Sequence, residues 1–151
     1  MNPPVTIRLL GPGDASVLNR VASDVFDNPV DSRWTAEFLA DPRHHMVVAL
    51  LGEQVVAMAS AVHYVHPDKP PELWVNEVGV APSQQRRGIG RQVLAALLAH
   101  GRSLGCTEAW LGTEASNVAA RRLYAVSGGH EAPMVYVTFQ LGVEVIVQRE
   151  P

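Results

Sequence analysis

The segment from Gln85 to Gly90 combines residue types that bind an anion. Its sequence is Gln-Arg-Arg-Gly-Ile-Gly, and it lies between an apolar run over residues 73–80 and an amphipathic run over residues 91–104. A strand that leads through a glycine-rich turn into a helix presents several backbone N–H groups at the positive end of that helix. Adjacent arginines add charge-assisted hydrogen bonds. The segment therefore predicts a site for a phosphorylated cofactor.

Two common nucleotide-binding motifs do not fit this segment. The dinucleotide fingerprint Gly-x-Gly-x-x-Gly fails because Val93 stands at the third glycine position. The Gly-Lys-Ser/Thr of a nucleotide P-loop is not found here either. A glycine pair also forms tight strand-to-helix turns that bind nothing, so the segment alone leaves the cofactor open.

The segments that would position this loop alternate between strand and helix patterns. Apolar and β-branched runs predict strands over residues 5–10, 46–51, 54–64, 73–80, 109–113 and 134–141, and residues 143–147 extend the last strand or form an extra edge. Periodic apolar positions predict helices over residues 14–25, 33–40, 88–104 and 117–127. This order predicts an α/β (α+β) fold with a mixed sheet and helices on both faces.

The composition predicts one globular domain over residues 1–151. The formal net charge of −3 argues against a chain built to coat nucleic acid or an anionic membrane. The single cysteine, Cys106, allows no intrachain disulfide. We find no signal-peptide pattern, and no apolar run approaches about 18 residues, so we expect a cytoplasmic protein.

A second motif makes the interpretation of the loop more specific. Residues 117–124, Asn-Val-Ala-Ala-Arg-Arg-Leu-Tyr, precede Gly128, and one predicted helix and one predicted strand separate them from the glycine loop. The loop resembles the Gln/Arg-x-x-Gly-x-Gly/Ala signature of the GCN5-related N-acetyltransferase (GNAT) superfamily. Residues 117–124 resemble the second signature of that superfamily, and the order and spacing of the two motifs also match. The resemblance covers residues 5 to about 141.

This resemblance implies the GNAT fold, whose mixed, mostly antiparallel central sheet is splayed at its middle. Acetyl-coenzyme A enters the gap, and its pantetheine arm pairs with the strand before the loop. The backbones of Val78 and Val80 would hold that arm, with one N–H facing the thioester oxygen. Gly88 and Gly90 are expected because a Cβ there would keep the backbone away from a phosphate. The pyrophosphate would bind the loop residues Gln85, Arg86, Arg87, Gly88, Ile89, Gly90 and Arg91.

Two side chains are candidates for catalysis. The resemblance implies that Tyr124 is the general acid for the departing thiolate, and a phenol pKa near ~10 suits a thiol near ~8.5. Glu77 is an acid in an otherwise apolar strand, and such a misfit is expected at functional sites. A carboxylate there is a natural base for the attacking amine. The alternatives are a packing tyrosine and a solvent-facing or ion-paired glutamate.

Other polar residues carry weaker expectations. Asn117 is expected to cap a helix, and the resemblance implies a contact with the cofactor arm. Cys106 has no histidine partner in a known pattern, which favours direct transfer without an acetyl-enzyme. The histidines, including His63 and His66, do not match metal-ligand spacings, so we expect no metal.

The acceptor is expected to be a small-molecule amine. Within the superfamily, residues 64–67 and 72–80 are most similar to the small aminoglycoside 3-N-acetyltransferases, which have aspartate where Glu77 stands. Acids that could face a polycationic acceptor are Asp24, Asp27, Asp31, Glu77 and Glu114. An alternative is a ribosomal-type N-terminal acetyltransferase, although Gly112 stands where that group has an acid. Another is a non-catalytic acetyl-coenzyme A-binding module, which would need neither Tyr124 nor Glu77.

Residues 143–151 are a candidate edge strand in a homodimer.

Overall fold

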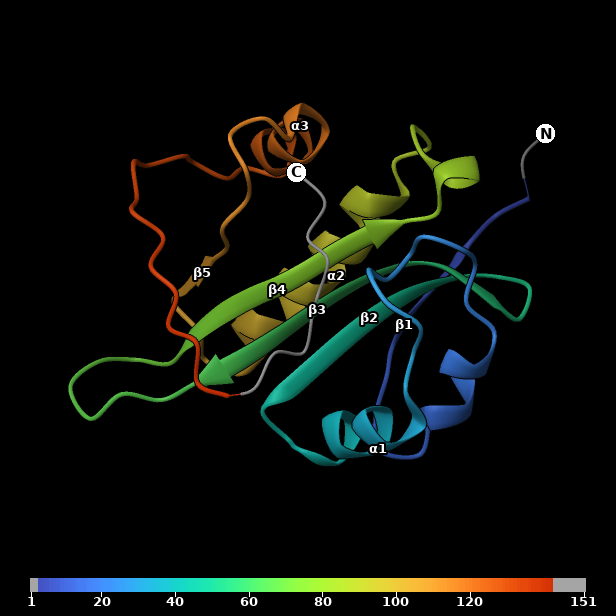
Figure 1. Cartoon of the computed structure of the whole chain (residues 1–151), viewed down its shortest axis with the longest axis horizontal. Coiled ribbons are helices and arrows are strands. Elements are labelled where there is room, and N and C mark those ends of the chain that lie inside the picture. The colour runs from blue at the N-terminus through green and yellow to red at the C-terminus, as the bar shows by residue number, and fades with distance from the viewer. Residues whose placement is uncertain (1–2, 143–151) are drawn as a thin grey trace.

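The computed structural model describes residues 3–142 and has a five-stranded sheet at its centre (Figure 1). The strands lie in the order β1-β2-β3-β4-β5, and only the pair β4–β5 is parallel. This arrangement confirms the predicted mixed, mostly antiparallel sheet. The strand bounds are β1 Thr6–Leu9, β2 His44–Leu51, β3 Gln54–Tyr64, β4 Glu72–Val80 and β5 Glu108–Trp110.

Helices cover both faces of the sheet, as the sequence predicted. The long helix α2 (Ile89–Ser103) runs behind β3 and β4 in Figure 1. We call the face that it covers the α2 face and the opposite one the front face. On the front side, α1 (Ser32–Ala40) follows the short 3-10 helix η1 (Ala15–Asn19). A second 3-10 turn, η2 (Pro82–Gln84), links β4 to the glycine loop, and α3 (Val118–Val126) follows β5.

The core lies on both faces of the central strands. Residues 55–61 of β3 are all buried, which explains why this strand is a continuous apolar run without alternation. At its middle, the α2 face of this strand carries three small side chains, Ala57, Ala59 and Ala61, and these are completely buried. Small side chains let α2 approach the sheet closely. Helix α2 contributes Val93 and Leu97, both 0% exposed, to the same core.

An irregularity in β4 decides which side chains share the front face. Ser60 pairs with Glu77 while Ala61 pairs with Val75, so Asn76 is an extra residue without a partner on β3. Such a β-bulge re-aims the side chains that follow it. Trp74 pairs with Val62, two residues from Ser60, and therefore lies on the same face as Glu77. Without the bulge, residues three apart would point to opposite faces.

The predicted helix over residues 14–25 is wrong beyond its first turn. Only Ala15–Asn19 forms a 3-10 helix, and the chain then joins the edge of β3. The Ala22 N–H donates to the Val55 carbonyl, and the Val55 N–H donates to the Arg20 carbonyl, each at 2.8 Å. These bonds use the backbone groups that a helix would have needed.

The C-terminal strand predictions also fail where they can be tested. Residues 134–141 form no strand, and Phe139 and Leu141 are 80% and 96% exposed. Their β-branched and aromatic composition suits a strand, but strand propensity is realised only against a neighbouring strand. Residues 143–147 lie outside the described residues. The strand predicted over residues 109–113 is shorter in the structure, where it is Glu108–Trp110.

None of the helices within residues 3–142 has the length and apolar character needed to cross a bilayer.

Candidate active site

A gap opens along one edge of β4. Only Glu72, Leu73 and Trp74 pair with β5, and the chain beyond Trp110 leaves the strand. Within residues 3–142, no strand pairs with this edge between residues 75 and 80. The backbone groups of Val78 and Val80 on that side are therefore available to an extended ligand, which could add to β4 as another strand. This confirms the expected splay of the sheet.

The glycine loop begins at the end of β4 and leads into α2. Arg86 has φ +60° and Gly88 has φ +74°, so two residues in close succession adopt the left-handed conformation. Left-handed residues in a turn are typical of backbone nests, in which neighbouring N–H groups point to one side and can bind an anion. For Arg86 the left-handed conformation is also strained, which is typical of functional sites. The first turn of α2 has no acidic residue that would oppose an anion.

The side chains of the loop have different positions. Gln85, Arg86 and Arg91 are exposed, whereas Ile89 is 2% exposed and anchors the start of α2 in the core. The Gln85 amide donates to the Val80 carbonyl at 3.4 Å, which ties the loop to the end of β4. The Arg87 guanidinium donates to the carbonyl of Pro3 at 2.8 Å and to the Gln84 side chain. Arg87 therefore holds the loop in place as well as adding charge beside it.

The two loop glycines serve different purposes. A Cβ on Gly90 would lie 3.2 Å from Cγ2 of Val80 and 3.4 Å from Cδ2 of Leu123. Gly90 therefore also lets β4, α2 and α3 meet closely, a packing role that the sequence did not indicate. Gly88 has open space around its Cβ position, and its positive φ is the reason for a glycine.

Helix α3 brings the second motif beside the loop. Asn117 is its N-cap, and its side chain accepts a hydrogen bond from the Ala120 N–H at 3.1 Å. Leu123 packs at the start of α2, and Tyr124, the next residue, is half-buried against the core. Burial raises the pKa of Tyr124, so its phenol remains protonated at neutral pH. A protonated phenol is the form that can act as an acid.

On the front face, Glu77 lies next to Asp27. The segment after η1 crosses β4 at Gly79, where a Cβ would lie 2.0 Å from the Val25 carbonyl oxygen. This crossing brings the Asp27 carboxyl within hydrogen-bonding reach of the Glu77 side chain. Burial, and after it the charge of Asp27, raises the pKa of Glu77. The negative charge of Asp27 therefore favours the protonated form of Glu77.

The other candidate acids, Asp24, Asp31 and Glu114, occupy three different environments. Asp31 is the N-cap of α1 and accepts from the Arg33 N–H at 2.8 Å. Asp24, with φ +64°, lines a hollow of about 460 Å³ together with Asp27. Glu114 is exposed in the irregular segment that precedes α3. Among the candidate acids of the described residues, Asp27 is the partner of Glu77.

Three features of this region were missed by sequence reasoning. These are the bulge at Asn76, the pairing of Asp27 with Glu77, and the stacking of Trp74 on Trp110, with ring centroids 5.4 Å apart. The sequence did contain a signal for the bulge. Trp74 and Glu77 are three residues apart in one strand, and they can share a solvent-facing side only if an extra residue lies between them. The pairing had no such signal, since it depends on where residues 20–30 cross the sheet.

Cys106 and the histidines lie elsewhere. Burial raises the pKa of the Cys106 thiol, which makes it a poor nucleophile. His45, His63 and His100 form a hydrogen-bonded cluster on the α2 face. Within residues 3–142, no group of three or more histidine, cysteine or acidic side chains has a geometry that could hold a metal.

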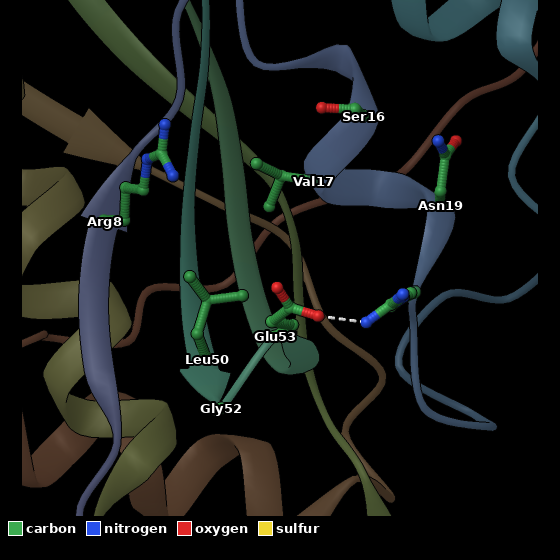
Figure 2. A pocket seen from close by; sticks show the side chains of 8 residues that line it. Arg8, Ser16, Val17, Asn19, Leu50, Gly52 and Glu53 are labelled. Atoms are coloured by element: carbon green, nitrogen blue, oxygen red, sulfur yellow. Dashed lines mark hydrogen bonds and ion pairs between the residues drawn. The ribbon is translucent and has the colours of Figure 1, made fainter.

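A second hollow, of about 470 Å³, lies on the β1 side of the molecule (Figure 2). Its walls come from β1, η1 and the β2–β3 turn, including Arg8, Val17 and Glu53, which pairs with Arg20. None of Glu77, Tyr124 or the glycine loop lines it. The groups that suit acyl transfer therefore gather around β4 and outside this hollow.

Residues 17–128 match the sequence model of the acetyltransferase (GNAT) family. The chain belongs to this family. The matched region contains Glu77, the glycine loop and Tyr124, so the whole site lies within the GNAT domain. The loop and residues 117–124 were therefore correctly interpreted as its two signatures.

Two curated relatives show different acceptors within the family. The chain is 36% identical over 132 residues to a mycothiol acetyltransferase of Thermomonospora curvata, covering 82% of this chain and 43% of the relative. It is 33% identical over 127 residues to the N-alpha-acetyltransferase RimI of Mycobacterium tuberculosis, covering 83% of this chain and 78% of the relative. The chain spans less than half the length of the mycothiol acetyltransferases it matches.

A solved structure shares the fold over nearly the whole chain. It is an aminoglycoside acetyltransferase from an uncultured soil metagenomic sample, in complex with sisomicin. The TM-score is 0.80 at 18% identity, with 91% of this chain and 97% of that chain covered. At this identity the likeness shows the GNAT fold and leaves the acceptor to be argued from the site.

Proposed function

We propose that this chain transfers the acetyl group of acetyl-coenzyme A directly to a primary amine of a small cationic acceptor. The observation that carries the proposal is the convergence around β4. An open strand edge, an anion nest at its end, a protonated phenol and a carboxyl pair belong to adjoining elements. Acetyl-coenzyme A would bind the open strand edge and the anion nest through its pantetheine arm and its pyrophosphate. Transfer to an amine would then use the phenol as acid and the carboxyl pair as base.

The donor half rests on the open edge of β4 and the loop. The pantetheine arm pairs with the backbone of Val78 and Val80, and the pyrophosphate binds the loop N–H groups from Gln85 to Arg91. A strand N–H directed at the thioester oxygen stabilises the negative charge that develops there during acyl transfer. Asn117 holds the start of α3 beside the arm. No metal takes part in this proposal.

The acceptor half rests on Glu77 and Asp27. An amine arrives as an ammonium, and it must lose a proton before it can attack. A carboxyl pair with one raised pKa attracts the cation and provides a base closer to neutral pH than an ordinary glutamate. We assign Glu77 as the base, acting directly or through a water, and Asp27 as the group that tunes it.

The chemical step balances with these two residues. The amine nitrogen attacks the thioester carbon, so a C–N bond forms and the C–S bond breaks. Glu77 passes the first ammonium proton to solvent before the attack and takes the second one once the C–N bond has formed. The departing thiolate takes the phenol proton of Tyr124, and the proton held by Glu77 returns to the tyrosinate through solvent. Burial keeps that phenol protonated until the thiolate leaves. Because Cys106 has a raised pKa and lies away from these groups, we propose no acetyl-enzyme.

The acceptor class follows from charge on the front face. Glu77 and Asp27 pair there, and Asp24 lines a hollow together with Asp27. This acidic surface suits a polycationic amine, and an aminoglycoside is one such compound. The fold shared with a sisomicin-bound acetyltransferase supports testing aminoglycosides first.

A second candidate acceptor is the N-terminal amine of a peptide. The observation in its favour is the match to RimI, which extends over 78% of that relative. Against it, Gly112 stands where the ribosomal N-terminal enzymes carry an acid. A non-catalytic acetyl-coenzyme A-binding module is the remaining alternative, and it gives no role to the Glu77–Asp27 pair.

An acceptor panel separates these candidates. Thiol release from acetyl-coenzyme A is followed with aminoglycosides, diamines, amino acids and short peptides. We expect release with small polycationic amines, whereas release with peptides alone would establish the second candidate. No acceptor-dependent release would favour the binding module.

Tyr124→Phe tests the general acid with the acceptor that the panel identifies. We expect kcat to fall about 100-fold, because proton transfer by a positioned side chain contributes about that much or more. Coenzyme A affinity, measured by calorimetry, should stay within about twofold, since the ring and its packing remain. The control is Tyr136→Phe, an exposed tyrosine outside the site. Unchanged turnover in Tyr124→Phe would overturn this assignment.

A further inference from the structure

Three aromatic side chains gather on the front face near the start of β4. Trp74 stacks on Trp110 with ring centroids 5.4 Å apart and planes at 11°. The Trp110 indole N–H donates to the Tyr64 hydroxyl at 2.8 Å, so β3, β4 and β5 each contribute one member. We call Tyr64, Trp74 and Trp110 the aromatic wall.

The wall is ordered but not enclosed. Its internal hydrogen bond and stacking fix the ring of Trp110, yet Trp74 is 41% exposed. The neighbouring Leu73 points to the α2 face and is 1% exposed, so the core is complete without the indole of Trp74. A large aromatic surface that the core does not need is typical of a binding surface.

The bulge at Asn76 places the wall in line with the acid pair. Trp74 and Glu77 share the front face, three residues apart along β4. Strand geometry makes that separation about 10 Å at most, and the bulge shortens it, so a ligand about 7–10 Å long reaches both. The same acceptor molecule can therefore contact the base and the wall at once.

The charges around the wall indicate which group binds there. Between Glu72 and Glu77, β4 carries two acids and no basic side chain. The nearby side chains of His66 and Lys69 are both engaged by Glu72, at 2.6 Å and 3.7 Å. An indole face attracts cations, and tryptophan does so more strongly than the other aromatic residues. A cationic group gains from this surface, and an anionic one does not.

We propose that Trp74 selects acceptors that carry a second ammonium group about 7–10 Å from the amine that is acetylated. The inference rests on the proposed function and specifies its acceptor class. The reacting amine lies at Glu77 and the second cation lies over the indole of Trp74. The wall sets the orientation of the acceptor, while Glu77 and Tyr124 perform the chemistry.

The test compares paired acceptors in the wild-type protein. Linear diamines with three to eight carbons are measured against amino alcohols of the same length, in which a hydroxyl replaces the second amine. We expect kcat/KM to favour the diamine by about 3- to 30-fold at lengths that span both sites, and by less at the shortest length. Equal values for diamine and amino alcohol at every length would overturn the inference while leaving the acetyltransferase activity established.

Variants assign the preference to the indole. Trp74→Leu keeps an apolar side chain but removes the π face, so the diamine preference should disappear through a higher KM for the diamine, with turnover of the amino alcohol retained. Trp74→Phe should restore part of the preference. Trp34→Leu, at a 65% exposed tryptophan on α1, is the matched control and should keep the preference. A preference that survives Trp74→Leu would also overturn the proposal.

Calorimetric binding of the same pairs, with coenzyme A present, gives a readout that does not require turnover. A diamine preference in binding with no acetylation would refute the proposed function and leave the wall as a cation site. No preference in either measurement would refute the wall.

Discussion

The two faces of the sheet at β3 and β4 hold their titratable groups in opposite ways. On the α2 face, His45 is 6% exposed among other imidazoles, and its pKa is lowered to about 4 by burial and by His100 and His63. On the front face, Glu77 is only partly buried beside another carboxyl, and its pKa is raised. Both groups are therefore driven toward the neutral form.

His45 and Glu77 differ in whether a ligand can reach them. Both ring nitrogens of the buried His45 are already bonded to His63 and His100, which leaves no polar atom of that ring free for a ligand. The carboxyl pair lies beside an edge of β4 that no described strand covers, where a ligand can reach it. A shifted pKa becomes a candidate for catalysis only when the group is also accessible.

The largest expected effect comes from Glu77→Gln. Removing the base should lower kcat/KM by about 100-fold or more, because the amine then has no acceptor for its proton. The pH–rate profile should also lose the rising limb that belongs to the carboxyl. Steady-state rates across pH in wild type and variant give both results.

The matched control is Glu114→Gln, which removes an exposed acid outside the pair. It should keep the rate and the profile of the wild type. Asp27→Asn sharpens the comparison further, because removing its charge should lower the pKa of Glu77 and move the rising limb to lower pH. A wild-type profile in Glu77→Gln would mean that the front face holds no base.

Gly79→Ala tests whether the crossing segment builds the acid pair. A Cβ at residue 79 would lie 2.0 Å from the Val25 carbonyl oxygen, a backbone atom that cannot rotate away. We expect a loss of about 3 kcal/mol in the free energy of unfolding and a Tm lower by about 5–10 °C. The segment that carries Asp27 must shift, so activity should fall even at temperatures where the variant is folded.

Thermal melts and rates at low temperature check this prediction. Gly13→Ala is the control, since nothing lies within 4 Å of a Cβ at that position and its φ is not positive. It should melt within about 2 °C of the wild type. A stable, fully active Gly79→Ala variant would show that the position of Asp27 does not depend on this contact.

The local structure of the glycine loop and of the start of α3 was predictable because it depends on short-range sequence. Gly88 needs its positive φ, Asn117 caps α3, and the loop follows β4 directly. Each of these features involves residues a few positions apart. The spacing of the two motifs then indicated the family and, through it, the splayed sheet.

The sequence offered Glu77 and Asp27 as candidate acids, but it could not predict their pairing, because that pairing depends on contacts between distant segments. The backbone of residues 20–22 forms hydrogen bonds with Val55 and not the bonds of a helix. This path of the chain places Asp27 beside Glu77. The bulge at Asn76 is visible only in the register between β3 and β4. Residues 134–141 show the converse, because a strand-like sequence forms no strand without a partner edge.

The smallest effect concerns the α2 face and the dependence of stability on pH. Both nitrogens of His45 have imidazole partners, His63 Nδ1 at 2.7 Å and His100 Nε2 at 3.0 Å. A neutral His45 donates to one partner and accepts from the other, whereas a protonated His45 must donate to both. Protonation therefore breaks the pattern and places a charge in a buried site.

The sign follows from the two pKa values. In the unfolded chain His45 binds a proton below about pH 6.5, but in the folded protein only below about 4. The contribution of neutral His45 to the free energy of unfolding is fully present above pH 6.5. It declines as the pH falls between these two values, by up to about 2 kcal/mol at pH 5.

Urea titrations from pH 8 to pH 5 should show this loss of stability. His45→Gln should flatten the decline, and His130→Gln, at an exposed histidine, should leave it unchanged. An identical decline in His45→Gln would mean that the α2 face is not the origin of the acid sensitivity, and the contrast between the two faces would then rest on Glu77 alone.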